Sequence, residues 1–164
     1  MPAVTLDRKI AWDILDADEG RGPVAVLDGD DPARLLARSR RIAMVGASAN
    51  PMRPSHGVME YLLRQGYEVV PINPTVESVL GQHSYATLEE AAAAAGAFDV
   101  VDVFRQPQHT PNIARSAVAT GAKALWLQLG VVNWEAAQIA RDGGLDVVMD
   151  RCTAIEHRRL RYLD

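Results

Sequence analysis

Residues 41–57 constrain the fold of this chain more than any other segment. An apolar run at residues 42–45 stops at Gly46, and small and polar residues follow as far as Ser55. Parallel α/β domains build phosphate sites in this way, because the glycine lets the backbone approach a ligand while free N–H groups of the next helix face the anion. The sequence therefore predicts an anion-binding turn between a first strand and a helix.

This turn departs from the spacing of a dinucleotide-binding site. The pattern G-x-G-x-x-G would need glycines at the positions of Ser48 and Pro51. Asn73 directly follows the second predicted strand, at the position where an NAD site carries an acidic side chain for the ribose hydroxyls. The predicted fold is compatible with an NAD(P) ligand, but the residues of these two turns lack the glycines and the acidic side chain that usually bind one.

Short apolar runs alternate with amphipathic stretches along the rest of the chain. Strands are predicted at residues 42–45, 68–72, 99–104, 124–128 and 145–149. Helices are predicted between them, with Thr87 and Asn133 as N-caps and Gly66 and Gly121 near C-terminal ends. This alternation favours right-handed βαβ units and an α/β, Rossmann-like, doubly wound parallel five-stranded sheet with helices on both faces. We expect the strand order 3-2-1-4-5.

Residues 1–40 are predicted to form an N-terminal extension with short helices, preceding a domain at residues 41–164. Ile10, Ile14 and Leu15 can share one face of a helix, whereas residues 18–31, rich in Gly and Asp, indicate a loop. Residues 32–40 are predicted to be helical, with Asp31 as the N-cap. At the other end, the basic residues 157–161 are predicted to form a solvated helix face.

Composition limits the classes of partner. The chain has 164 residues, of which 48% are hydrophobic, enough for a sizeable core. Its net charge of −4 gives no general attraction to nucleic acid. No continuous apolar segment indicates a signal peptide or a membrane span, and Cys152 is the single cysteine, so we expect a cytoplasmic protein without a disulfide.

In this topology ligands bind beyond the carboxyl ends of the strands, so the residues that follow each strand are the candidates for a site. Backbone N–H groups, hydroxyls and one guanidinium follow the first strand, a set that suits a pyrophosphate. These candidates are Gly46, Ala47, Ser48, Asn50, Pro51, Arg53 and Ser55. The candidates after the later strands are Asn73, Pro74, Phe104, Arg105, Gln128, Leu129, Gly130 and Cys152.

Purely structural roles stay open for several of these residues. Gly46 can serve only to make a tight turn, and Ser55 only to cap a helix. Asn73 and Pro74 are ordinary turn formers, and the tract after Gln128 can be a simple strand-to-helix connection. The sequence does not decide between these roles and ligand binding.

Cys152 is predicted to lie at the ligand-facing edge of the sheet. Arg151 and a helix start at Thr153 would make its thiol more reactive, while the alternative is a small buried apolar residue. The four histidines show no metal-ligand spacing, and neither a catalytic triad nor a P-loop motif is present. We therefore expect no metal site and a binding protein rather than an enzyme.

Several ordered motifs follow the predicted strands. They read Val45-Gly46-Ala47-Ser48, Asn50-Pro51, Arg53-Pro54-Ser55, Pro71-Ile72-Asn73-Pro74, Val79-Leu80-Gly81, Val100-Val101-Asp102-Val103-Phe104-Arg105, Ala122-Lys123-Ala124-Leu125-Trp126-Leu127-Gln128-Leu129-Gly130 and Val148-Met149-Asp150-Arg151-Cys152. Together they resemble the small bacterial and archaeal CoA-binding protein family. The domain of that family is similar to the CoA-binding Rossmann domain of the succinyl-CoA synthetase α subunit.

The resemblance implies a role for each group of candidates. Contacts to the CoA phosphates are implied for Gly46, Ala47, Ser48 and Arg53. Asn73-Pro74 would lie near the adenosine, Phe104-Arg105 and Gln128-Leu129-Gly130 would line the pantetheine path, and Cys152 would lie near the reactive end. Thr75 stands where many relatives are expected to carry a lysine, which removes a charge on the adenosine side. The 164 residues hold no counterpart of the synthetase domain with the phosphorylated histidine, so a CoA ligase is not implied.

The leading hypothesis is a non-catalytic carrier, sensor or store of CoA or an acyl-CoA. One alternative is an NAD(P)-binding redox sensor or oxidoreductase. Another is a thiol switch in which Cys152 forms a mixed disulfide with CoA. The expected partner is a CoA-type small molecule, with no nucleic acid and no membrane, and a homo-oligomer or a complex with a further protein stays open.

Overall fold

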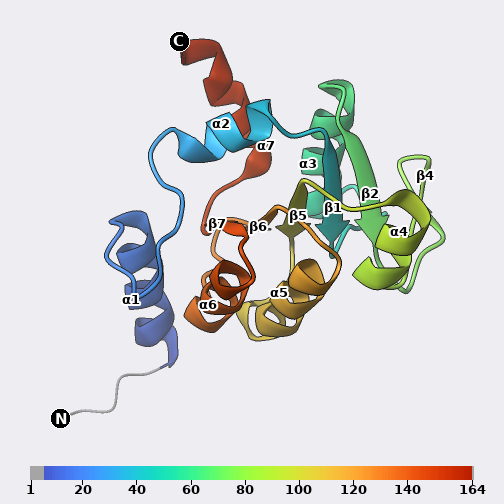
Figure 1. Cartoon of the computed structure of the whole chain (residues 1–164). Helices are drawn as coiled ribbons and strands as arrows, with labels where there is room; N and C mark the ends of the chain where they lie inside the picture. Colours follow the sequence, from blue (N-terminus) through green and yellow to red (C-terminus); the bar gives the residue numbers. More distant parts are fainter. Residues whose placement is uncertain (1–5, 164) are drawn as a thin grey trace.

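The computed structural model describes residues 6–163, with side chains from residue 11 onward. A five-stranded parallel sheet forms its centre (Figure 1). Its strands are β1 (Arg41–Val45), β2 (Glu68–Ile72), β5 (Val100–Val103), β6 (Ala124–Leu127) and β7 (Asp146–Val148). A separate antiparallel pair, β3 (Ser78–Val79) and β4 (Gln82–His83), lies between β2 and the next helix in the chain. The predicted fold class is confirmed.

The strand order is β2-β1-β5-β6-β7, so the predicted order 3-2-1-4-5 is wrong. Counted along the chain, the order is 2-1-3-4-5, and the third long strand pairs with the first rather than continuing the sheet beyond the second. Pro71 explains the difference. Its carbonyl accepts the Tyr85 N–H on the side away from β1, and on that side its own nitrogen has no proton for a further strand. β2 is therefore an edge strand, and the topological switch point lies between β1 and β5.

Helices cover both faces of the sheet. One face carries α2 (Asp31–Ala37), α3 (Pro54–Arg64) and α7 (Thr153–Arg159), and the other carries α4 (Leu88–Ala95), α5 (Thr110–Ala119) and α6 (Trp134–Asp142). Two short 3-10 helices, η1 (Pro107–His109) and η2 (Leu160–Tyr162), precede α5 and follow α7. The N-cap predictions are confirmed, since Thr87 accepts the Glu90 N–H at 3.1 Å and Asn133 accepts the Ala136 N–H at 2.8 Å.

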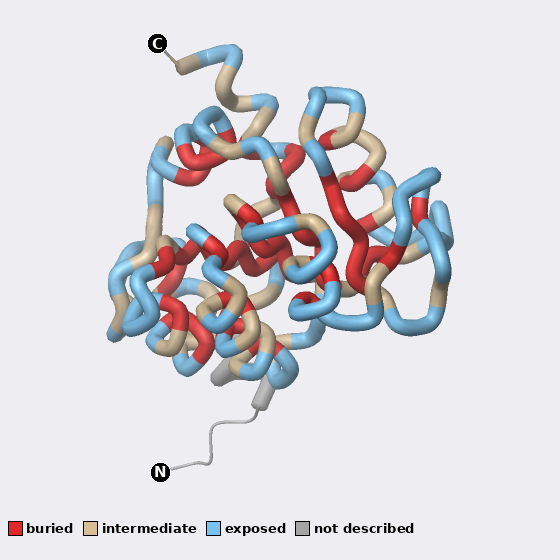
Figure 2. The backbone as a smooth tube through the Cα atoms, turned by 45° about the vertical axis from the view of Figure 1, so that its right-hand side comes forward, coloured by how far each residue is buried: buried red, intermediate tan, exposed pale blue. Residues whose placement is uncertain are grey.

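The sheet separates two apolar cores, and its central strands are the most buried part of the backbone (Figure 2). Successive residues of β1 alternate between them: Ala43 and Val45 belong to the core under α4, α5 and α6, while Ile42 and Met44 belong to the other. Because both faces are covered, nearly every strand residue is buried, as a parallel sheet requires.

The N-terminal part joins the sheet through a few specific contacts. α1 (Leu6–Asp18) contributes Ala17 to the core under α6, whereas Leu15 is exposed; the side chain of Ile10 lies outside the described residues. The Leu27 N–H donates to the Val147 carbonyl at 2.8 Å, so this segment covers the free edge of β7. The predicted N-cap Asp31 is displaced by one residue, since Asp30 precedes α2 and Asp31 is its first residue.

The basic residues at 157–161 are not simply a solvated face, which corrects the prediction. Nδ1 of His157 lies 2.7 Å from the Tyr61 hydroxyl on α3, and partial burial lowers the pKa of His157. Arg159 forms ion pairs with Glu156 at 2.6 Å and with Asp30 at 2.5 Å. These contacts tie α7 to α3 and to the start of α2.

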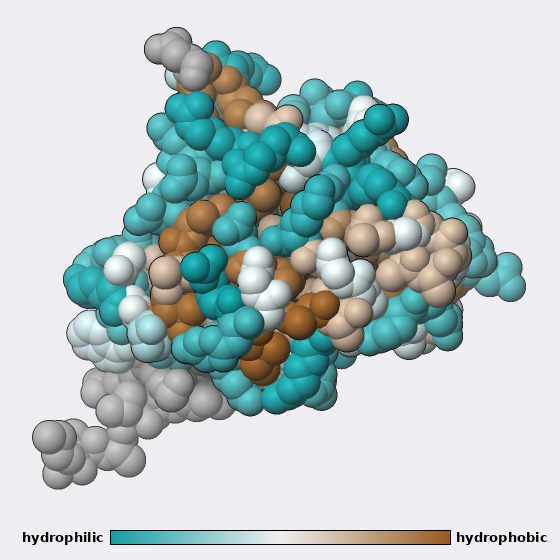
Figure 3. All heavy atoms as spheres, in the orientation of Figure 1, coloured by the Kyte–Doolittle hydropathy of each residue, from teal (hydrophilic) through white to brown (hydrophobic). Residues whose placement is uncertain are grey.

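The face of the molecule drawn in Figure 3 is mostly hydrophilic, with apolar patches in its central part. Among the described helices, none combines the length and apolar character needed to cross a membrane.

Candidate functional site

A cavity of about 640 Å³ opens at the carboxyl ends of β1, β5 and β6, where the strand order reverses. It is lined by Gly46, Ser48, Arg53, Pro54, Ser55, Val58, Phe104, Arg105, Gln106, Pro107, Gln128, Leu129, Gly130, Val131 and Cys152. Ligands of open α/β sheets bind at this position. The loops after β1, β5, β6 and β7 and the first turn of α3 therefore form one candidate site.

Gly46 allows the turn after β1 to approach the loop after β5. Its φ is +85°, and a Cβ at this position would lie 2.5 Å from the Phe104 carbonyl oxygen. The Gly46 N–H donates to the Ile72 carbonyl at 3.0 Å, which joins the turn to the end of β2. A side chain at this position would force apart two walls of the cavity.

Side-chain hydrogen bonds give the loop from Ser48 to Ser55 its shape. The Ser48 N–H donates to Oγ of Ser55 at 3.1 Å, and Oγ of Ser48 accepts the Asn50 N–H at 3.0 Å. Oδ1 of Asn50 in turn accepts the Met52 N–H at 3.0 Å. Several backbone N–H groups that could bind an anion are thus already used inside the loop. The guanidinium groups of the arginines are therefore the main groups left to bind one.

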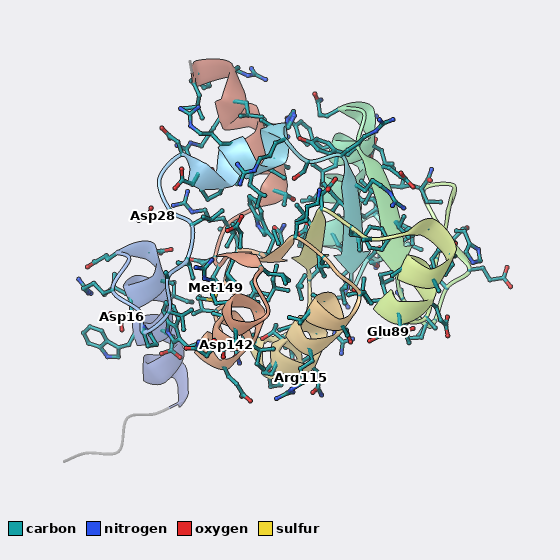
Figure 4. The ribbon with its side chains drawn as sticks, in the orientation of Figure 1. Asp16, Asp28, Glu89, Arg115, Asp142 and Met149 are labelled. Carbon is teal, nitrogen blue, oxygen red and sulfur yellow. The ribbon has the colours of Figure 1, made fainter. Side chains whose placement is uncertain are left out.

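Arg53 and Arg105 bring two guanidinium groups to the cavity. Arg53 immediately precedes α3, and Arg105 follows β5. Neither guanidinium has an ion pair or a hydrogen bond to another described residue. Other arginines lie elsewhere, such as Arg115, which projects outward from α5 (Figure 4) and pairs with Glu135 at 3.5 Å. The cavity therefore offers two uncompensated cations beside a helix N-terminus, where an anion is favoured.

A fully buried carboxyl lies beneath the cavity. Asp102 of β5 has no exposed surface, and burial raises its pKa to about 7, against hydrogen bonds from Gln128 and Thr153 that lower it. Nε2 of Gln128 donates to Oδ1 of Asp102 at 2.6 Å and to Oγ1 of Thr153 at 3.1 Å. The Thr153 hydroxyl donates to Oδ2 of Asp102 at 3.0 Å.

Cys152 lies at the cavity wall and is half-buried. It occupies the position before α7, and the indole Nε1 of Trp126 donates to the neighbouring Arg151 carbonyl at 2.7 Å. Asp150, which has a φ of +56°, accepts the Gly130 N–H at 2.6 Å and so links the loops after β6 and β7. These contacts fix the backbone around the thiol.

The structure brings most of the predicted site residues together on this cavity. Ala47, Asn50, Pro51, Asn73 and Pro74 do not line it. Asn73 instead joins two turns: its Nδ2 donates to the Ala47 carbonyl at 2.8 Å, and its Oδ1 accepts the Thr75 N–H at 2.9 Å. Its side chain is therefore used within the protein.

Sequence reasoning missed some lining residues and the buried carboxyl. Pro54, Val58, Gln106, Pro107 and Val131 line the cavity because they lie next to predicted residues or in the first turn of α3. The signal for Asp102 was available, since it is a lone acidic residue within the apolar strand Val100–Val103. Its role depends on Gln128 and Thr153, far away in sequence, and a strand pattern does not reveal such partners.

The rest of the described molecule offers a further cavity and no metal-binding cluster. A smaller cavity of about 210 Å³ lies at the carboxyl ends of β1 and β2, beside the start of α4 and the side chains of α5. Within the described part of the chain, no group of three His, Cys, Asp or Glu side chains could hold a metal ion.

The parallel sheet and the cavity at its switch point define a Rossmann-like protein with a candidate ligand site that carries two arginines. The family model of the CoA binding domain matches residues 40–158, most of the chain. The protein belongs to this CoA-binding domain family, which confirms the resemblance drawn from its motifs.

Relatives of known sequence or structure agree with this assignment. The chain is 40% identical over 123 residues to the uncharacterised protein YneT of Bacillus subtilis, covering 75% of this chain and 89% of the relative. A hypothetical protein from Pyrococcus horikoshii has a TM-score of 0.76 at 40% identity, over 81% of this chain and 92% of that one. A Thermus thermophilus structure has a TM-score of 0.72 at 33% identity, over 80% and 98% of the two chains.

The close approach at Gly46 predicts the effect of a small substitution. Gly46→Ala should destabilise the protein by about 3 kcal/mol, since it adds overpacking against a backbone carbonyl to the cost of a left-handed alanine. Gly66→Ala is the matched control, because Gly66 has a φ of +92° and a Cβ there would meet nothing within 4 Å. It should cost only about 1 kcal/mol. Urea unfolding measures both, and equal losses would contradict the steric explanation.

Proposed function

We propose that the cavity binds CoA or an acyl-CoA, and that the protein is a non-catalytic carrier, sensor or store of this cofactor. The observation that carries the proposal is the pair Arg53 and Arg105, two guanidinium groups in one cavity without an anionic partner among the described residues. Membership of the CoA-binding domain family supports a CoA-type ligand in general.

The remaining lining suits a long, partly apolar ligand with charged phosphates at one end. Val58, Phe104, Pro107, Leu129 and Val131 supply apolar walls that can cover a pantetheine arm. The volume of about 640 Å³ lies within the range usual for small-molecule sites. Phosphates placed at the arginines would leave the thiol end of the ligand to the region of Gln128 and Cys152.

The chemistry of the lining supports binding rather than catalysis. Ser48, Ser55 and Cys152 are its nucleophile-type side chains, and no histidine or carboxylate belongs to the lining as a base beside them. We therefore include no reaction on the acyl group in the proposal.

Isothermal titration of the purified protein with CoA, acetyl-CoA and NADH tests the proposed ligand. We expect saturable heat with a CoA compound and none with NADH, because the G-x-G-x-x-G glycines and the ribose-binding acid are missing. Binding of NADH without binding of either CoA compound would favour the redox alternative and reject the proposal.

Removal of either guanidinium should weaken CoA binding. Arg53→Gln and Arg105→Gln are each expected to lower the affinity about tenfold, since each loses a charged contact to phosphate. Pantetheine lacks the phosphates, so its affinity should not change. Arg115→Gln is the matched control, because Arg115 is an exposed arginine outside the cavity lining. Equal losses for CoA and pantetheine would indicate a general disturbance of the site rather than phosphate contacts.

The position of Cys152 favours a second candidate, a thiol switch. Its thiolate would attack one sulfur of CoA disulfide, forming a Cys152–CoA mixed disulfide and releasing the other CoA as thiolate, which takes up a proton. The half-buried thiol lines the proposed CoA cavity, which supports this step.

Intact mass after incubation with CoA disulfide tests the thiol switch. The wild type should gain the mass of one CoA, and a reductant such as dithiothreitol should remove it. Cys152→Ser should gain nothing. An unchanged wild-type mass would reject the switch and leave the reversible binding of CoA untouched.

A further inference from the structure

The cluster of Asp102, Gln128 and Thr153 has a geometry that the proposed binding of phosphates does not require. Both protons of the Gln128 amide nitrogen are used below the cavity, at 2.6 Å to Oδ1 of Asp102 and at 3.1 Å to Oγ1 of Thr153. The Thr153 hydroxyl is itself held by its hydrogen bond to Oδ2 of Asp102. The amide of Gln128 is therefore fixed from the protein side.

The carbonyl oxygen of the same amide has no such partner. No hydrogen bond of the described residues uses Oε1 of Gln128. In the described part of the chain, every fully buried side-chain oxygen has a hydrogen bond. Since Oε1 of Gln128 has none, this atom is not fully buried. Gln128 lines the cavity although only 5% of its surface is exposed, and the open part of the side chain must include this acceptor.

We propose that Asp102 and Thr153 are positioning residues that hold the Gln128 amide with its carbonyl oxygen toward the cavity. The site thereby selects a ligand group that donates a hydrogen bond, such as an amide N–H or a free thiol. This inference rests on the proposed function, because the pantetheine arm of CoA carries both kinds of donor. A group that only accepts, such as a thioester carbonyl, finds no partner at this atom.

The orientation depends on the ionisation of Asp102. As a carboxylate, Asp102 can only accept hydrogen bonds, so it requires the Gln128 N–H groups to face it. When protonated, its O–H can donate to Gln128, which permits the amide to turn and present its NH₂ group to the cavity. The pKa of Asp102 is raised to about 7, so the carboxylate form prevails above this pH and is lost below it.

No charge contributes to the pKa shift of Asp102. One other acidic pair titrates in this range: burial, together with its hydrogen bond to Asp150, raises the pKa of Asp18 to about 6, and Asp150 accepts the Gly130 N–H at the cavity. This pair is unchanged by Asp102→Asn, so it contributes equally to the two proteins compared below. The remaining ionisable groups on the surrounding elements have partners of their own. Ion pairs or hydrogen bonds join Asp99 to Lys123, Arg41 to Glu68, Glu156 to Arg151 and Arg159, and His157 to Tyr61. In the cavity itself, the ionisable side chains are those of Arg53, Arg105 and Cys152. Cys152→Ser is therefore used as the background for the pH experiments, which removes the thiol from consideration.

The first experiment compares CoA affinity at pH 8 and pH 6 in the Cys152→Ser background, with and without Asp102→Asn. The quantity compared is the ratio of the dissociation constant at pH 6 to that at pH 8. Because the phosphates of CoA titrate equally with both proteins, a difference in this ratio between the two proteins comes from the Asp102 carboxyl. Because one ligand hydrogen bond is lost below pH 7, this ratio should be about fivefold larger with Asp102 present than in the Asp102→Asn variant, whose amide does not ionise. Equal ratios would overturn the inference.

Asp99→Asn is the matched control, because Asp99 precedes the same strand at the opposite edge of the sheet. Burial opposes its ionisation, yet hydrogen bonds from the Arg41 and Arg40 N–H groups and from Lys123 lower its pKa. Asp99 stays ionised from pH 6 to pH 8, and its variant should keep the pH dependence of the parent. A loss of pH dependence in this control as well would count against a specific role for Asp102.

The second experiment needs neither ligand nor a substitution at Asp102. The side-chain ¹⁵N–¹H₂ resonance of Gln128, assigned by its absence in Gln128→Met, should shift with a midpoint near pH 7 in the free protein, the pKa of Asp102. A resonance that stays constant between pH 6 and pH 8 overturns the inference. If no CoA binds at any pH while this resonance titrates, the proposed function fails and the coupling of Asp102 to Gln128 stands.

Discussion

The site depends on the pairing of β1 with strands on both sides. β2 pairs with one side of β1 and β5 pairs with the other side. The chain therefore continues from β1 and from β5 in opposite directions across the sheet, and a crevice opens between the loops that follow these two strands. The crevice is narrow at its base, where Gly46 meets the Phe104 carbonyl without a side chain between them. The pairing therefore creates the cavity, and the glycine sets how closely its two walls approach.

Charge placement, rather than overall charge, is what suits this crevice to the proposed anionic ligand. The chain carries a net charge of −4, and many of its arginines form ion pairs at the surface. Arg53 and Arg105 lack such partners among the described residues and both reach the cavity. A local pair of cations attracts a phosphate at short range even when the whole molecule is acidic, since charges more than about 10 Å apart are largely screened at moderate salt.

Much of this arrangement can be read from the sequence. The strands, the two N-caps and the turn at Gly46 depend on residues close together in the chain, and local patterns predicted them. The strand order depends on which edges can pair, and the sign that β2 is an edge strand was a single residue, Pro71. The contact of Arg159 with Asp30 joins residues from opposite ends of the chain, and a local pattern of charge suggested only a solvated face.

The buried carboxyl shows why the floor of a site is harder to predict than its rim. Residues of the rim follow the strands directly, so topology alone assigns them to one edge. Asp102 lies within a strand, and its significance arises only when β6 and α7 bring Gln128 and Thr153 to within hydrogen-bonding distance. Burying a carboxyl without a cation costs free energy, which the raised pKa of Asp102 reflects. An apolar residue would avoid this cost but would leave one Gln128 N–H without its acceptor, which is unfavourable in turn. In the proposed arrangement the carboxyl is therefore the group that both satisfies the Gln128 amide and fixes its direction.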